Sequence, residues 1–220
     1  MIEGVKMRYV AFDIESANSE SGVVSDICEF GYMIADENFC IKDKKSIKIR
    51  PRRVGKWNED NHGIKMEDYE LCPEFRCVYP IIKKLLEHHD QMLFAHDAQK
   101  DLAYLGRECR RNELDAPQIE VYDTKKIWEK FKNPMSGKTN LKEIAESMGI
   151  KLEGHRPDED SEACLYIPKT IFEEIGKEKF QILIEEYKDT IVKTQDTKKE
   201  LDKWEQHMKN EKSLGNQTIY

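Results

Sequence analysis

The sequence predicts an α/β fold in which helices flank a mixed five-stranded sheet. Two features of the 220-residue chain predict it. Three strand-like stretches come first, with a hairpin-type turn between the second and the third, which favours antiparallel pairing. After them, helical and strand-like stretches alternate, which is typical of a layered domain with helices packed on a sheet. We therefore expect antiparallel strands joined to a helix-connected part of the same sheet.

The first three strands are expected at residues 8–15, 27–35 and 39–50. The first two are mostly apolar, as strands in a core are. The short polar run Asp36-Glu37-Asn38 separates the second from the third and predicts the hairpin turn.

The alternating elements follow. Apolar side chains at helical spacing predict a helix over residues 79–89, and Met92-Leu93-Phe94-Ala95 is a short apolar strand suited to the middle of a sheet. The remaining expected elements are a helix from 96 to about 111, a strand at 119–122, a helix at 140–148 closed by Gly149, and a helix that begins near Pro157.

From about Lys169 the composition changes, and we place a domain boundary there. Residues 1–170 form the main domain, and residues 171–220 form a charged, amphipathic helical extension with a frayed end. The extension carries two apolar stripes, separated by a break at 194–197. The stripes are Phe180, Leu183, Ile184, Tyr187 and Ile191, then Leu201, Trp204 and Met208. The helices either dock on the domain or form an arm that binds a partner.

Composition limits the class of protein. The chain is 39% hydrophobic and 36% charged, without an apolar run near the roughly 18 residues that a membrane span needs, and its start does not resemble a signal peptide. We expect a cytoplasmic protein with reduced, scattered cysteines. The net charge of −7 excludes a generally basic nucleic-acid-binding surface, although bound cations would offset part of it.

One local stretch is basic despite the overall charge. Lys48 and Arg50 alternate with isoleucines in the third strand, and the run continues through Arg52, Arg53 and Lys56. Such a run either protects the edge of a sheet with charge or faces the phosphates of a substrate.

Two carboxylates stand out at the end of the first strand. Because strand side chains alternate, Asp13 and Glu15 point to one side of the sheet and Phe12 and Ile14 to the other. Like charges held together repel, and a cation between them relieves the repulsion. Oxygen-only ligands suit Mg²⁺ or Mn²⁺.

Further polar residues are expected to join this pair. Asp101 lies on the helix after the 92–95 strand, and Asp160 lies on a later helix, five residues after His155. If those helices pack on the sheet, all five residues can converge at one end of its central strands. The four acids and the histidine form the candidate catalytic set.

This combination resembles the DEDDh 3′→5′ exonucleases, the family of the proofreading epsilon subunit of DNA polymerase III, RNase T and oligoribonuclease. The stretch from Phe12 to Asn18 is similar to the first family motif and is especially like the epsilon-type bacterial enzymes. The other matching stretches are Ile27-Cys28-Glu29-Phe30-Gly31, His62-Gly63-Ile64, His96 to Asp101, and His155 with Asp160. The resemblance covers about residues 7–168.

Three positions depart from the family pattern. The second motif usually reads His-Asn-x-x-Phe-Asp, whereas this chain has Asp97 and Lys100 in place of the asparagine and the phenylalanine. Pro157 stands where the third motif often has alanine. Lys100 either perturbs the metal site or contacts a phosphate.

The resemblance implies an RNase H-like fold and catalysis with two metal ions, Mg²⁺ or Mn²⁺. Asp13 would bridge both ions, Glu15 and Asp160 would complete the site of the attacking water, and Asp101 would support the second ion. His155 would be the general base, since an imidazole titrates near neutrality.

Other residues are expected around the substrate or the fold. Ser16, His62, His96 and Lys100 are the expected substrate contacts, and Asp123 is a helix cap rather than a ligand.

We expect an exonuclease that releases 5′-mononucleotides from a free 3′ end, with single-stranded DNA favoured. An exoribonuclease of the RNase T or oligoribonuclease type is the alternative within the class. A catalytically silent module that binds nucleic acid or a polymerase is the alternative from another class. A polymerase or another protein is a further expected partner, bound through the C-terminal helices.

Overall fold

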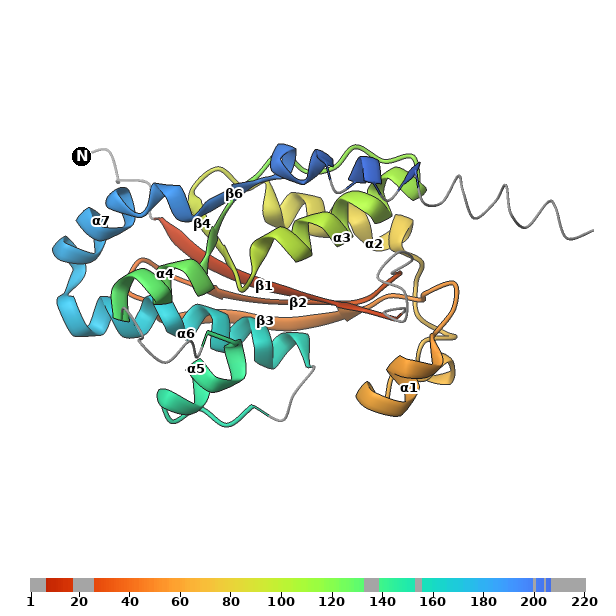
Figure 1. Cartoon of the computed structure of the whole chain (residues 1–220), viewed down its shortest axis with the longest axis horizontal. Helices are drawn as coiled ribbons and strands as arrows, with labels where there is room; N and C mark the ends of the chain where they lie inside the picture. Colours follow the sequence, from red (N-terminus) through yellow and green to blue (C-terminus); the bar gives the residue numbers. More distant parts are fainter. Residues whose placement is uncertain are drawn as a thin grey trace, which may run out of the picture.

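The computed structural model describes residues 7–17, 26–132, 139–152, 156–199, 201–203 and 205–206, without the side chains of Trp57, Asn61 and His62. Its centre is a six-stranded sheet with the order β3-β2-β1-β4-β5-β6 (Figure 1). The strands are β1 (Arg8–Ser16), β2 (Ile27–Ala35), β3 (Ile41–Lys48), β4 (Gln91–Ala95), β5 (Glu120–Asp123) and β6 (Ile191–Lys193). The predicted fold class is confirmed, but the predicted number of strands is one too low.

The sheet is mixed, as the order of elements predicted. β1, β2 and β3 pair antiparallel, whereas β4 pairs parallel to both β1 and β5. β4 contacts β1 only along Arg8–Ala11. The C-terminal half of β1 therefore extends past the end of β4, and this projecting half carries Asp13 and Glu15.

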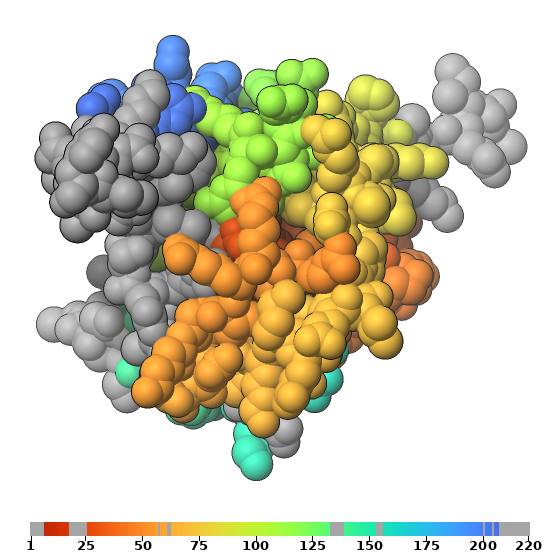
Figure 2. Space-filling model, turned by 90° about the vertical axis from the view of Figure 1, so that its right-hand side faces the viewer, coloured from red at the N-terminus to blue at the C-terminus, as the bar shows by residue number. Residues whose placement is uncertain are grey.

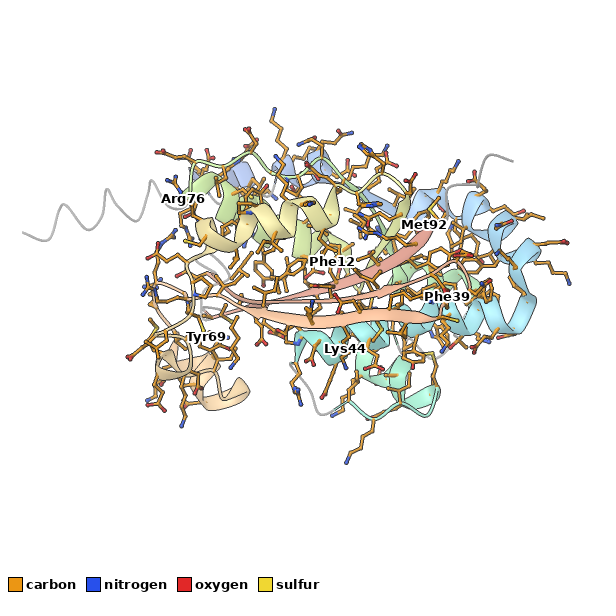
Figure 3. The ribbon with its side chains drawn as sticks, turned by 180° about the vertical axis from the view of Figure 1, so that it is seen from behind. Phe12, Phe39, Lys44, Tyr69, Arg76 and Met92 are labelled. Carbon is orange, nitrogen blue, oxygen red and sulfur yellow. The ribbon has the colours of Figure 1, made fainter. Side chains whose placement is uncertain are left out.

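Helices cover both faces of the sheet. Val10, Phe12 and Ile14 of β1 join a core with α2 (Phe75–Leu86) and α3 (Ala98–Arg111). Tyr9 and Ala11 join a second core on the opposite face. That face is covered by α4 (Thr124–Lys132), α6 (Pro157–Ile175) and α7 (Lys177–Glu186). Figure 3 shows Phe12 in the first layer and Phe39 in the second.

Alternation along β1 fixes the side on which its carboxylates lie. Asp13 and Glu15 share the parity of Tyr9 and Ala11, so they face the layer that contains α6. The short helix α5 (Leu141–Ser147) lies in the same layer, and its N-cap Asn140 accepts a hydrogen bond from the backbone N–H of Glu143.

A short helical segment closes the end of the sheet beyond β1. α1 (Lys56–His62) is bound to the chain after β1, because Asn58 Nδ2 donates to the carbonyl of Ser16 at 2.8 Å. Gly63 ends α1 in the left-handed conformation, with a φ of 65°, which glycine adopts readily. Ile64 is buried against Ala17 beside it. The one-turn helix η1 (Met66–Asp68) follows.

Figure 2 views the molecule from this end. Red and orange atoms of the first strands are visible between the green α3 and the orange segment that leads into α1. The end of β1 is thus framed by α1 on one side and α3 on the other.

The C-terminal part packs on the same sheet. The predicted boundary between residues 170 and 171 falls within α6, and Phe180 and Ile184 of α7 are buried in the second core. After η2 (Lys188–Thr190), β6 pairs with β5, and η3 (Thr194–Thr197) follows. Assigning Ile191 to a helix was wrong, because Ile191 and Val192 are β-branched residues that extend the open edge of β5.

Within the described ranges, no helix is long and apolar enough to cross a membrane. All six cysteines are free.

Candidate functional site

The site is built first by the pairing of β1 with β2. Asp13 lies opposite Gly31, and Glu15 lies opposite Glu29. Gly31 leaves room for another element directly beside Asp13. A methyl group on Gly31 would lie 2.1 Å from the backbone carbon and oxygen of Pro157, so only glycine lets the first turn of α6 approach this closely.

The approach of α6 brings the third carboxylate to the pair. Asp160 lies in the first turn of α6, three residues after Pro157. Oxygen atoms of Asp13, Glu15 and Asp160 all lie within 4.8 Å of one another. Two neighbouring residues of β1 and one residue of α6 thus offer one cluster of oxygen atoms.

Asp101 approaches this cluster from the other helix layer. It lies in the first turn of α3 and is 5% exposed. The charge of Asp101 is the strongest of the neighbouring charges that raise the pKa of Asp13, after burial itself. Burial and the charge of Glu15 likewise raise the pKa of Asp101. Hydrogen bonding to the Ile14 backbone opposes both shifts without cancelling them.

Neighbouring negative charges and burial make this arrangement of carboxyl groups costly for the protein alone. The carboxylates repel one another in a desolvated place, and a divalent cation among them would remove this cost. The donors are all oxygen atoms, which suits a hard cation such as Mg²⁺ or Mn²⁺. The residues present therefore fit a divalent metal ion.

The loop before α3 is held in an unusual conformation that aims Asp101. Asp97 adopts a φ of 61° and a ψ of 47°, a left-handed conformation that Asp and Asn tolerate better than most residues. The backbone N–H of Asp97 donates to Asp123 Oδ1 at 3.2 Å. The same oxygen accepts the N–H of Lys125 at 3.1 Å, so Asp123 caps the start of α4 and also positions the loop.

His96 is bound within the protein. With a neutral ring, its Nε2 donates to the carbonyl of Thr139 at 2.9 Å and its Nδ1 accepts from the Thr124 hydroxyl at 3.1 Å. Burial lowers the pKa of His96 to about 4, so the ring is neutral at physiological pH. Both ring nitrogens are thus already engaged, and His96 joins the end of β4 to α4 and to the chain before α5.

The other expected residues divide into three groups. Ser16 is buried at the end of β1, where its carbonyl receives Asn58. Lys100 is 70% exposed in its side chain and forms a 2.5 Å ion pair with Asp97. The backbone of His62 ends α1, but its side chain lies outside the described groups, and His155 lies outside the described residues.

A cavity adjoins the carboxylates on the side of α3. It has a volume of about 380 Å³ and lies between the starts of α3, α4 and α5. Asp13 and Asp101 line one side of it, and Lys100 and Lys125 are its basic residues. Sequence reasoning missed Lys125, although its position just after β5, at the same sheet edge as the motif after β4, could have indicated it.

The sequence model of the RNase T exonuclease family matches residues 10–167, well over half of the chain. The chain belongs to this exonuclease family. The predicted enzyme class and the DEDDh-type fold are confirmed. The narrower likeness to the epsilon-type enzymes stays a prediction.

Solved structures show the same fold at low sequence identity. The nuclease domain of 3′hExo, a DEDDh family member bound to rAMP, aligns with a TM-score of 0.68 and 18% identity, covering 79% of this chain and 96% of that one. E. coli exonuclease I in complex with a dT13 oligonucleotide aligns with a TM-score of 0.65 and 11% identity, covering 76% and 41%. No match was found among curated proteins.

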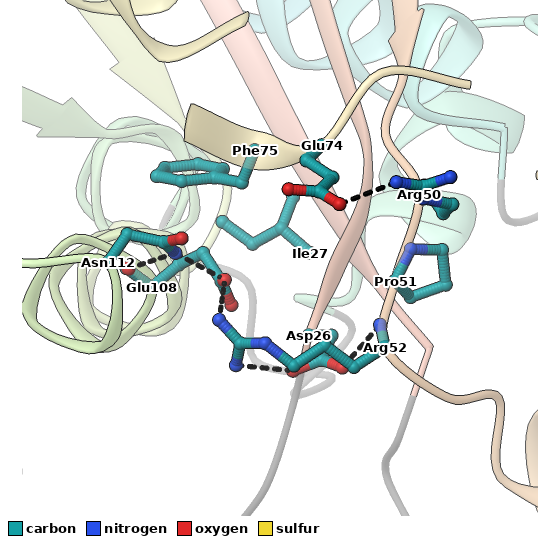
Figure 4. A pocket seen from close by; sticks show the side chains of 9 residues that line it. All are labelled: Asp26, Ile27, Arg50, Pro51, Arg52, Glu74, Phe75, Glu108 and Asn112. Atoms are coloured by element: carbon teal, nitrogen blue, oxygen red, sulfur yellow. Dashed lines mark hydrogen bonds and ion pairs between the residues drawn. The ribbon is translucent and has the colours of Figure 1, made fainter. Parts of the chain in front are cut away.

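A second acidic cluster in this exonuclease shows how carboxylates behave without a metal role. Asp26 and Glu108 are buried at the edge of a cavity of about 150 Å³ (Figure 4). Arg111 forms an ion pair with each of them, and Arg52 Nη2 lies 3.3 Å from Glu108 Oε1. These charges are balanced by arginines, so this cluster is an ion-pair network that joins β2, α3 and the chain after β3.

The same contacts decide between the two interpretations of the basic run for two of its five members. Arg50 pairs with Glu74 at 2.5 Å and Arg52 with the buried acids, so both hold the fold together at the sheet edge. The ammonium group of Lys48 instead lies over the ring of Tyr69, 5.2 Å from its centre. In the sheet, Lys48 of β3 pairs with Glu29 of β2, which in turn pairs with Glu15 of β1.

Proposed function

We propose that this exonuclease requires divalent metal ions and removes 5′-mononucleotides from the 3′ end of single-stranded nucleic acid, with DNA as the favoured substrate. The observation that carries the proposal is the cluster of Asp13, Glu15 and Asp160 with Asp101 beside it. Burial and neighbouring negative charges raise the pKa values of Asp13 and Asp101, whereas arginines balance the charges of Asp26 and Glu108.

Each residue has a proposed task. Asp13, Glu15, Asp160 and Asp101 would hold two Mg²⁺ or Mn²⁺ ions. The ions would supply the positive charge that lets a nucleophile approach a phosphodiester and that stabilises the leaving oxygen. His155 would accept the proton of the attacking water as the bond from phosphorus to the 3′ oxygen breaks. The products are a strand one nucleotide shorter, with a new 3′ hydroxyl, and a nucleotide that keeps the phosphate.

A ribonuclease is the second candidate, and one comparison favours it. The solved structure that the chain covers to 96% is bound to rAMP, whereas exonuclease I is bound to a DNA oligonucleotide. The distinction depends on how the 2′ hydroxyl is received. A silent binding module is disfavoured, because it would not need four neighbouring carboxylates. The predicted polymerase partner stays a prediction.

Digestion of end-labelled strands tests the proposal. A single strand labelled at its 5′ end, as DNA and as RNA of the same sequence, is incubated with Mg²⁺, with Mn²⁺ and with a chelator. We expect a ladder that shortens from the 3′ end, requires a metal ion, and forms faster on DNA. Faster digestion of RNA would make the enzyme an exoribonuclease. Internal cuts, or digestion that persists with the chelator, would contradict the proposal.

A further inference from the structure

The cavity beside the carboxylates is larger than a metal site alone would require. It borders the carboxylates but extends away from the Asp13–Glu15–Asp160 cluster, toward the starts of α4 and α5. Its volume of about 380 Å³ falls in the range of sites that bind small molecules. A group of about one nucleotide would fit there while remaining next to Asp13.

Two lysines place positive charge at this cavity. Lys125 is half-buried at the second position of α4, where Asp123 fixes its backbone. Lys100 lies at the other side on α3, where the 2.5 Å ion pair with Asp97 holds its ammonium group. The N-terminus of α4, a nine-residue helix, adds a partial positive charge on the same side.

The balance of charge depends on the metal site. Three carboxylates, of Asp13, Asp97 and Asp101, and two lysines line the cavity, and His96 is neutral. The cavity is therefore net negative without a metal ion, and one divalent cation at Asp13 makes it net positive. An anion is attracted only when the metal site is filled.

We propose that this cavity binds the phosphate group next to the scissile phosphate, with Lys125 and Lys100 as its cationic contacts. The inference rests on the proposed exonuclease function. A strand whose scissile phosphate lies at the Asp13 carboxylate must pass a neighbouring phosphate into an adjoining space, and this cavity adjoins Asp13 and carries two lysines. Asp97 and Lys100 stand where the family pattern has asparagine and phenylalanine, and in this chain the two residues form an ion pair. The position of the aromatic ring is therefore taken by a positive charge.

Replacing one phosphate at a time by an uncharged linkage identifies the phosphate that contacts the cavity. Short single strands labelled at the 5′ end carry one methylphosphonate, which lacks the phosphate charge, at a single position counted from the 3′ end. Affinity is measured by fluorescence anisotropy in Ca²⁺, which takes the same oxygen ligands, on strands verified to stay intact. In the wild type, we expect the linkage next to the scissile one to weaken binding roughly threefold to tenfold, the scale of one charge-assisted contact.

Variants then assign the contact to the lysines. In Lys125→Gln, the same uncharged linkage should cause a smaller loss than in the wild type, because one of the two cationic partners of the phosphate is gone. Lys100→Gln should weaken binding of the charged strand, whereas Asp97→Asn should strengthen it by releasing Lys100. The matched control is Lys84→Gln, which removes an exposed lysine of α2 that does not line this cavity and should preserve the full linkage effect.

Two results would overturn the inference. One is an equal effect of every linkage, which would indicate diffuse attraction only. The other is a linkage effect that is as large in Lys125→Gln as in the wild type, which would place the phosphate elsewhere. Cleavage of the all-phosphate strand in Mg²⁺ is measured in parallel. Cleavage without the linkage effect refutes this inference alone, whereas absent cleavage refutes the proposed function.

Discussion

At the scale of single residues, the site depends on carboxyl groups placed where they are costly. Burial and mutual repulsion raise the pKa values of Asp13 and Asp101. The charges of two other buried acids, Asp26 and Glu108, are instead balanced by ion pairs with arginines. The contrast distinguishes the acids that we propose as metal ligands from the acids that stabilise the fold.

His155 is predicted to accept the proton of the attacking water and not to bind the metal ions. His155→Ala should lower kcat by roughly 10²–10⁴-fold, the usual contribution of a general base. Metal affinity in a calorimetric titration should change little, since the four carboxylates remain. His89→Ala, which removes an exposed histidine far from the site, is the control. A near-wild-type kcat in His155→Ala would show that this histidine is not the base.

His96 is predicted to make stability depend on pH. The unfolded ring has a pKa near 6.5 and the folded ring a pKa of about 4, so the unfolded state binds more protons between these values. Stability should therefore be full above about pH 6.5 and fall as the pH drops toward 4. The loss should be about 3 kcal/mol, from the shift in pKa.

His96→Gln tests this by denaturant unfolding at several pH values. The variant should start less stable at pH 7 and should lack the extra loss seen in the wild type below pH 6.5. Parallel pH profiles for the two proteins would contradict the assignment of His96 as a buried neutral cross-link.

At the scale of elements, the site depends on one close approach. β1 presents Asp13, and Gly31 on β2 admits the first turn of α6, which carries Asp160. The sequence motif around Gly31 was recognised by resemblance alone. The structure supplies its physical reason, which is the space that α6 needs.

Gly31→Ala is predicted to separate Asp160 from Asp13. The added carbon would overlap the Pro157 backbone, so α6 must shift, at a cost of roughly 1–3 kcal/mol in stability. Stabilisation of the fold by Mn²⁺ in a thermal melt should fall sharply, together with cleavage. Gly106→Ala is the control, because its added carbon would meet only the flexible end of Leu201. Equal behaviour of the two variants would show that the approach of α6 does not build the site.

Sequence patterns within an element predicted helices and strands better than they predicted which elements would pack together. The alternation in β1 and the apolar run in β4 indicated the strands that carry the site, because the core imposes those patterns. The strand β6 was missed, because three residues are too few for a periodic signal and their partners on β5 lie 69 to 73 residues earlier in the sequence. The cavity with Lys125 was also missed, since it forms only when α3, α4 and α5 meet.

At the scale of the whole molecule, the C-terminal part is a layer of the domain core. The ring of Phe180 packs against Tyr9, Phe39 and Phe172, with ring centres 5.6 to 6.2 Å apart. This arrangement matches the docked alternative for α7 and leaves the candidate carboxylates on other elements.

Phe180→Ala is predicted to reduce stability without altering chemistry. Removing a fully buried phenylalanine should cost about 3–5 kcal/mol in denaturant unfolding, with kcat unchanged under conditions where the variant is folded. Ile182→Ala on the same helix removes a side chain that is 61% exposed and should be nearly neutral. If Phe180→Ala is as stable as the wild type, α7 is an arm for a partner instead.

The central claim is that Asp13 holds the metal ions that cleave the strand. The most direct measurement is mononucleotide release by Asp13→Asn in Mn²⁺, with calorimetric titration of Mn²⁺ into the same protein. The variant keeps the size of the side chain and removes the charge that repels Asp101, so it should fold at least as stably as the wild type in a chelator. We expect loss of both metal binding and nucleotide release. Release at the wild-type rate from the folded variant would contradict the account.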